Sequence, residues 1–273
     1  MHSQAGCSRR SFLKASAAGL AGLAALRGGP GLALPRSGKK GFCGAAEIYR
    51  PALDCDWYYN WSLSPSPGIA LPFAPMVWGW HDQRTPRRLR ILSGQQPILF
   101  GFNEPDGRNQ ANLSVPVALD AWLHIQNLAE EIVSPSCVNA RGRWMSNFMI
   151  QAERRGLRID SVGVHSYSGP NVGEVVERLE ETHRMYGRPL WVTEIAVADW
   201  RAADGARVNR YGEQATMDFM TEIVGFMEAT PWIKGYAWLA SGTYGDGGPL
   251  STSAFLDADG RASPMMTHYA ALL

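Results

Sequence analysis

The chain has 273 residues, 45% of them hydrophobic, which is enough to bury the core of one large domain or of two small ones. Its formal net charge of +1 hides an asymmetry, because residues 1–33 carry Arg9, Arg10, Lys14 and Arg27 and no acid. Without these four residues the chain carries 22 of its 26 basic residues and all 25 acidic ones, a net charge of −3. This balance argues against nucleic acid or an anionic membrane as the partner.

The N-terminal segment has the pattern of an export signal. Residues 8–14 read Ser-Arg-Arg-Ser-Phe-Leu-Lys and resemble the twin-arginine signal at every fixed position. The weakly apolar stretch 15–26 that follows is too short to span a bilayer. We therefore predict that residues 1–37 are a signal peptide and linker, with an uncleaved anchor as the alternative. The source is expected to be a bacterium or an archaeon.

Export by this route would deliver the protein to the periplasm or the extracellular space. The rest of the chain has no apolar run long enough for a transmembrane helix. We therefore expect a mature form that is soluble, has no membrane partner and is a monomer by default.

Eight segments with strand character recur in the mature chain, at 41–46, 57–61, 73–78, 97–102, 132–136, 159–165, 189–195 and 233–239. Helical patterns fall between several of them, at 84–92, 115–130, 143–156, 172–187, 210–230 and 264–273. Gly156 and Gly187 stand where helix C-caps belong. This alternation predicts an α/β fold, a compact (β/α)8 TIM barrel over residues 38–273. Helices are not expected after the first two strands, so the outer ring should be incomplete near the N-terminus.

Two glutamates lie near strand ends. Glu104 follows the fourth predicted strand, and Glu194 lies near the end of the seventh. The carboxyl ends of barrel strands meet on one face, where barrel enzymes carry their active sites. We predict Glu104 as general acid and base and Glu194 as nucleophile, with carboxyl groups about 5–5.5 Å apart as retention requires. The alternatives are a surface acid that closes a strand and a rim acid paired with an arginine.

Other polar and aromatic residues are predicted to bind substrate. Asn103 would bind the hydroxyl next to the reacting carbon, or else cap the following turn. His165 or Tyr167 would hydrogen-bond Glu194 and hold it ionised, although a satisfied core histidine is the alternative for His165. Trp238 would floor the subsite of the cleaved sugar, with ordinary packing as the alternative. Stacking on further sugar rings, with core packing as the alternative, is predicted for Tyr59, Trp61, Trp78 and Trp80. Trp200, in a long loop, is a weaker candidate.

The sequence predicts no metal and no cofactor. The chain has four cysteines, Cys7, Cys43, Cys55 and Cys137. They form neither a CxxC motif nor a Cys/His cluster, which argues against structural zinc or an iron–sulfur cluster. A bridge between Cys43 and Cys55 is one pairing that export would allow, but connectivity cannot be deduced from sequence. His81-Asp82 has no third metal ligand at helical spacing, and the mature chain has no nucleotide-binding glycine motif.

Short motifs in a fixed order resemble glycoside hydrolase family 128, a clan A family. They are Tyr-Tyr-Asn-Trp at 58–61, Gly-Phe-Asn-Glu-Pro-Asp at 101–106, Ser-Pro-Ser at 134–136, His-Ser-Tyr at 165–167, Trp-Val-Thr-Glu at 191–194 and the tail 256–269. The resemblance implies a (β/α)8 endo-β-1,3-glucanase with a retaining mechanism and a β-1,3-glucan polysaccharide or oligosaccharide as partner. The sequence departs from the family at Ser166, where a bulky aromatic residue is expected.

Three function classes remain open at this point. The first is a secreted retaining endo-β-1,3-glucanase, which the presence of both carboxylates favours. The second is a non-catalytic β-glucan-binding protein on a glycosidase scaffold, because a fold does not dictate a function. The third is an oxidoreductase loaded with a cofactor before export, and the lack of metal and nucleotide motifs counts against it.

Overall fold

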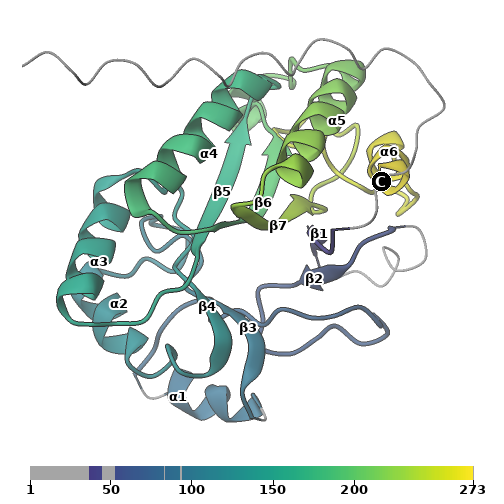
Figure 1. The fold of residues 1–273 in the computed structure, drawn as a ribbon. Helices are drawn as coiled ribbons and strands as arrows, with labels where there is room; N and C mark the ends of the chain where they lie inside the picture. Colours follow the sequence, from purple (N-terminus) through teal and green to yellow (C-terminus); the bar gives the residue numbers. More distant parts are fainter. Residues whose placement is uncertain (1–36, 45–52, 83, 93, 273) are drawn as a thin grey trace, which may run out of the picture. The chain divides into compact units, whose positions relative to one another are not determined.

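The computed structural model describes residues 37–44, 53–82, 84–92 and 94–272, so the predicted leader lies outside the described residues except for Ser37. All paired strands run parallel, in two sheets (Figure 1). One sheet has the order β2-β1-β7-β6-β5 and consists of β1 (Lys40–Cys43), β2 (Trp57–Tyr59), β5 (Val162–Ser168), β6 (Leu190–Val197) and β7 (Ile233–Leu239). The other pairs β3 (Gln96–Phe100) with β4 (Ala129–Val133).

The helices lie between the strands in sequence, as predicted. They are α1 (Thr85–Arg88), η2 (Leu89–Ile91), α2 (Val115–Trp122), α3 (Arg143–Arg154), α4 (Val172–Tyr186), η3 (Trp200–Ala202), α5 (Glu213–Ala229) and α6 (Pro264–Ala271). Figure 1 shows α4 and α5 beside the strands β5, β6 and β7. The described part of the chain is therefore an α/β structure with parallel sheets.

The third predicted strand, at 73–78, is wrong. Among the described residues only Phe73 and Met76 of this segment pair, through isolated parallel bridges to β2 and β3. Pro72 and Pro75 lack the N–H groups that a continuous ladder needs. The described residues thus form seven strands, and a closed eight-stranded barrel is not confirmed. Further isolated bridges, Val133 with Ser161 and Cys137 with Val164, connect the edge of β4 to β5.

One predicted helix is too long and several boundaries are confirmed. The apolar face expected over 115–130 is fully buried, but α2 ends at Trp122 and Ala129 already belongs to β4. Strand pairing therefore outweighed helical periodicity in the second half of that segment. Gly187 caps α4 with a φ of +60°, and Gly156, with a φ of +66°, follows the end of α3. The prediction that both glycines stand at helix ends is confirmed, because each adopts the left-handed conformation that ends a helix.

Aromatic side chains fill the space between the two sheets. Trp191 of β6 packs edge-on against Trp57 of β2, at 5.2 Å between ring centroids, and against Phe100 of β3, at 5.6 Å. A Cβ at Gly235 would lie 2.2 Å from the Trp191 ring, so glycine is required on the neighbouring strand. This layer supports the side chains at the carboxyl ends of the strands.

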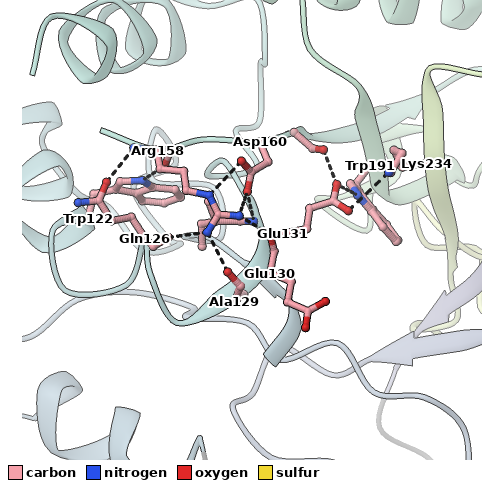
Figure 2. A network of polar contacts seen from close by, with 11 residues as sticks. Trp122, Gln126, Ala129, Glu130, Glu131, Arg158, Asp160, Trp191 and Lys234 are labelled. Atoms are coloured by element: carbon pink, nitrogen blue, oxygen red, sulfur yellow. Dashed lines mark hydrogen bonds and ion pairs between the residues drawn. The ribbon is translucent and has the colours of Figure 1, made fainter. Parts of the chain in front are cut away.

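A polar network links the two sheets below this aromatic layer (Figure 2). Glu131 of β4 accepts a hydrogen bond from the Trp191 indole N–H at 2.9 Å and one from the Ser161 hydroxyl. Lys234 of β7 lies 3.8 Å from the same carboxylate. The nearby Arg158 donates to the Ala129 carbonyl at 2.9 Å and pairs with Asp160 (Figure 2). The network therefore joins β4 to β6 and β7.

Glu131→Ala should lower the free energy of unfolding by about 1–3 kcal/mol, because it leaves the Trp191 N–H and the Ser161 hydroxyl without their acceptor. Urea denaturation measures the loss. Glu130→Ala is the matched control, since this neighbouring side chain is exposed. Equal stability of the two variants would contradict the role given to Glu131.

Cys43, Cys55 and Cys137 are buried thiols that form no disulfide within the described residues, so the Cys43–Cys55 bridge is wrong. Burial raises the pKa of Cys43 well above its ordinary value. No described helix is both long enough and apolar enough to cross a membrane.

Candidate active site

Glu104 lies in the loop after β3, in a strained backbone conformation. Its φ is +41°, a region that non-glycine residues rarely adopt and that clusters at functional sites. The Glu104 N–H donates to the Ser136 carbonyl at 2.7 Å, and the preceding Asn103 forms a parallel bridge with Ser136. These contacts hold the Glu104 carboxylate, 12% exposed, at the end of the two-stranded sheet.

A bulge in β6 directs Glu194 toward the same region. β5 pairs Val164 with Val192 and then His165 with Glu194, so Thr193 is an extra residue. Strict alternation from Trp191, whose ring lies between the sheets, would place Thr193 and not Glu194 on that side. The bulge reverses this choice and places Glu194 beside the aromatic layer.

Four side chains direct donors at the Glu194 carboxylate. The Tyr59 hydroxyl, at 2.8 Å, and the Trp61 indole N–H, at 2.7 Å, donate to Oε1. The Tyr167 hydroxyl donates to Oε2, and His165 Nδ1 lies 3.3 Å from Oε2. Burial and the Glu194 charge raise the pKa of Tyr59 and of Tyr167 well above their ordinary values. Both tyrosines therefore remain donors at all ordinary pH, and the arrangement stabilises ionised Glu194.

His165 connects the two carboxylates. Its Nδ1 lies 2.9 Å from Glu104 Oε1, and its side chain is 1% exposed. Burial acts to lower the pKa of His165, but the Glu194 charge, the Glu104 hydrogen bond and the Glu104 charge outweigh it, so the pKa is raised. Among the described residues Glu104 thus has one close side-chain partner, His165, whereas Glu194 has four, an asymmetry that suits two different roles in one reaction.

These groups open into a cleft of ≈510 Å³. Its lining is Trp61, Trp78, Asn103, Glu104, Gln110, Val138, Tyr167, Glu194, Trp200, Leu239, Ser241 and Leu250. Trp78 stands in the wall and is 40% exposed, and stacking on a sugar needs such an accessible aromatic side chain. The structure thus brings together eight of the ten predicted site residues, with Tyr59 and His165 directly behind the wall.

Two predicted tryptophans lie elsewhere. Trp238 is fully buried, donates its N–H to the Ser253 carbonyl at 2.9 Å and packs against Tyr269, so it cannot floor a sugar subsite. Trp80 is 7% exposed and stacks on His124 at 5.2 Å, away from the cleft lining. Both side chains point from their segments into protein packing.

Sequence reasoning missed Gln110 and Ser241. Gln110 accepts a hydrogen bond from the Asn103 amide at 3.1 Å, and Ser241 lines the cleft just after β7. Gln110 lies seven residues after Asn103 within one loop, and no motif marks a loop residue that folds back. Stacking by Tyr59 was mispredicted, because the side chain is fully buried and its hydroxyl donates to Glu194, whereas stacking by Trp61, which lines the cleft, stays a prediction.

The loop after β6 is anchored by Asp199. Its carboxylate accepts from the Arg201 guanidinium at 2.9 and 2.8 Å and from the Arg210 N–H at 3.2 Å. The Arg201 hydrogen bond holds the pKa of Asp199 well below its usual range. Trp200, 55% exposed, stands on this anchored loop with its ring 5.8 Å from that of Tyr167. The weakly predicted Trp200 is thus part of the cleft.

A metal ion is a poor fit to the centre of the cleft. One atom each of Glu104, His165 and Glu194 lies within 4.8 Å of the other two, which is close enough to consider a cation. However, both Glu194 oxygens already accept from O–H and N–H groups, and His165 Nδ1 lies at hydrogen-bond distance from Glu104. This donor set suits proton transfer, and the expected absence of a metal stays a prediction.

Tyr167→Phe should lower kcat by about 10–100-fold, because Glu194 loses one charge-assisted hydrogen bond. Tyr236→Phe is the control, because Tyr236 donates to Glu228 at 2.7 Å and is not part of the cleft lining. An unchanged kcat for Tyr167→Phe would contradict this role.

The chain is similar in fold to several solved structures. One similar solved structure is a mutant of a glycoside hydrolase family 128, subgroup I, endo-β-1,3-glucanase from Amycolatopsis mediterranei, in complex with laminaritriose and laminaribiose. It is 25% identical, covers 86% of this chain and 100% of its own, and has a TM-score of 0.71. A subgroup VII oligosaccharide-binding protein from Trichoderma gamsii, at 21% identity, 86% and 93% coverage and a TM-score of 0.68, shows the same fold.

A curated relative matches over a shorter part of its own length. Alkali-sensitive linkage protein 1 of Schizosaccharomyces pombe is 27% identical over 218 residues, which are 76% of this chain and 38% of that protein. The chain therefore spans under two fifths of that relative. The model of the family described as the glycosyl hydrolase catalytic core matches residues 44–269. The chain belongs to this glycosyl hydrolase family, and its predicted resemblance to family 128 is confirmed.

Proposed function

We propose that the chain is an exported endo-β-1,3-glucanase that cleaves its substrate with retention of configuration. The observation that carries the proposal is the pair of unequal carboxylates in one cleft, with one oxygen of each within 4.8 Å of the other. Retaining glycosidases have carboxyl groups about 5–5.5 Å apart, whereas inverting enzymes leave about 6.5–9.5 Å for a water. The β-1,3-glucan assignment rests on the similar enzyme that was crystallised with laminari-oligosaccharides.

We assign the two roles from the contacts of each carboxylate. Glu194, held ionised by its donors, attacks the anomeric carbon while Glu104 gives its proton to the leaving glycosidic oxygen, so the C–O bond breaks and a glycosyl ester forms on Glu194. Glu104 then takes a proton from water, whose oxygen attacks the anomeric carbon and releases Glu194. His165 contacts both carboxylates and balances their charge in both steps.

Asn103 is placed to bind the sugar at the reacting carbon. Its amide N–H₂ donates to Gln110, while its Oδ1 is buried and has no partner within the described part of the chain. An unsatisfied buried acceptor costs about 1–3 kcal/mol, which a substrate hydroxyl at this point of the cleft wall would recover. Trp78 and Trp200 offer ring faces for neighbouring sugars.

The deciding experiment is product analysis on linear β-1,3-glucan. We expect short oligosaccharides whose new reducing ends are first formed in the β configuration, as followed by NMR during early turnover. Products first formed as α anomers would contradict the retaining mechanism. Release of glucose alone would contradict endo action.

A second candidate is a non-catalytic β-glucan-binding protein. The observation in its favour is the shared fold with an oligosaccharide-binding protein. Binding of laminari-oligosaccharides without any cleavage would support this candidate and reject the enzyme.

Export is supported by the twin-arginine pattern at 8–14, and it is tested by fractionation of producing cells.

A further inference from the structure

A second cavity, of ≈250 Å³, adjoins His165. It lies among β5, which contributes His165 and Ser166, the loop after β4, and α4, which contributes Arg178 and Thr182. Glu104 and Glu194 line the catalytic cleft and not this cavity. His165 therefore stands as a partition, with the carboxylates at Nδ1 and the cavity on its other side. The catalytic proposal does not use this cavity.

Two buried polar atoms in the cavity wall lack protein partners. His165 Nε2 and Arg178 Nη2 have no hydrogen-bond partner among the described residues. Arg178 is fixed on α4 through its Nε, which donates to the Glu174 carbonyl at 3.1 Å. Burying a hydrogen-bond donor without a partner costs free energy, so these two groups favour a ligand that accepts hydrogen bonds.

The charges around the cavity favour an anion. None of its described lining residues is an aspartate or a glutamate. Arg141 is neutralised by an ion pair with Glu181, whereas Arg178 has no acidic partner in the described part of the chain. With its proton on Nε2, His165 presents an N–H donor to the cavity, while Nδ1 lies beside the two carboxylates.

We propose that this cavity binds a small oxyanion, such as phosphate, sulfate or a carboxylate, between Arg178 and His165 Nε2. The volume exceeds the space of one water and accommodates such an ion, and Ser166 in the wall offers a hydroxyl to it. The bound oxyanion accepts hydrogen bonds from the Arg178 guanidinium and from the His165 Nε2–H. A free oxyanion and an anionic substituent on a sugar would accept the same hydrogen bonds.

Through His165, an anion in this site would affect the proton that Glu104 donates. This part of the inference rests on the proposed function. An anion at Nε2 makes the imidazole ring more basic. The proton on Glu104 Oε1 then moves to Nδ1, which leaves Glu104 as a carboxylate and His165 as an imidazolium. The other groups that act on the ring are the carboxyl groups of Glu194 and Asp106 and the hydroxyl of Tyr167, whose raised pKa keeps its proton in place. Glycosidic cleavage slows because Glu104 has lost the proton that it must donate.

Binding is tested with inorganic phosphate and the full chain, by calorimetry and by the ring-nitrogen NMR signals of His165. We expect saturable binding and a shift of the Nδ1 and Nε2 signals toward imidazolium. Arg178→Met should weaken phosphate binding by about tenfold or more, the worth of one charge-assisted hydrogen bond. Arg184→Met is the matched control, since Arg184 lies on the same helix, makes the same kind of backbone contact through Nε and is absent from the cavity wall.

Ser166→Met is a second variant, which fills the cavity without removing a charge, and it should also abolish phosphate binding. Unchanged phosphate affinity in both variants, or no binding by the wild type, would overturn the site. Shifted His165 signals with neutral laminaribiose but not with phosphate would show a sugar subsite instead. These readouts need no turnover, so they separate this proposal from the glucanase proposal. With an active enzyme, phosphate should lower kcat/KM at constant ionic strength in wild type and not in Arg178→Met.

Discussion

Glu194→Gln should lower kcat on linear β-1,3-glucan by about 10⁴-fold or more, the scale seen when a catalytic nucleophile is removed. Glutamine has the same shape, and its amide oxygen still accepts from Tyr59 and Trp61, but it lacks the charge that attacks the anomeric carbon. The measurement is initial rates of reducing-end release for the purified variant and wild type. Folding should be retained, as judged by thermal unfolding.

Two controls separate this effect from contamination and from misfolding. Glu130→Gln, at an exposed side chain, should keep full activity. Laminari-oligosaccharides should bind Glu194→Gln with an affinity close to that of wild type, because the cleft wall is intact. Full activity of Glu194→Gln would reject Glu194 as the nucleophile. A loss of both binding and folding would mean that the donors around Glu194 have a structural role.

Glu104→Gln should lower kcat/KM on glucan by about 10²–10⁴-fold, the usual contribution of a general acid. The loss should depend on the leaving group. A dinitrophenyl β-laminaribioside needs no proton to leave, so its first chemical step should remain within about tenfold of wild type. The measurement is the pre-steady-state burst of dinitrophenol, followed by slow turnover because water is no longer deprotonated in the second step.

The same substrate distinguishes the two glutamates. Glu194→Gln should give no burst with the activated substrate, since the covalent intermediate cannot form. A burst in Glu194→Gln and none in Glu104→Gln would reverse the assigned roles. Equal losses on glucan and on the activated substrate for Glu104→Gln would mean that Glu104 acts by holding the substrate and not by giving a proton.

The motifs located both glutamates correctly at the carboxyl side of the strands, because a short apolar run followed by a polar loop is a local pattern. Helix ends were predictable for the same reason. Gly187 permits the left-handed residue that ends α4, and the Asn171 side chain accepts from the Glu174 N–H at 3.2 Å to begin it. The strand at 73–78 was wrong, although Pro72 and Pro75 were visible in the sequence as a warning.

The details of the site depended on contacts distant in sequence. Tyr59 and Glu194 lie 135 residues apart, and no periodicity shows that their polar atoms meet. Alternation alone does not say which side of a strand faces the cleft, so Trp61 and Trp238 looked equally suitable from the sequence. The first proved to hold Glu194, and the second proved to be core.

The sequence by itself determined the parallel α/β class, the order of the motifs and the two acids, because each depends on neighbouring residues and on short apolar runs. The tertiary structure decided which side chains reach those acids. The bulge at Thr193 turned Glu194 inward, the strained backbone at Glu104 directed the second carboxylate, and packing placed His165 between them. Such choices are made by steric fit and by the cost of burying unpaired polar groups, which involve residues far apart in the chain.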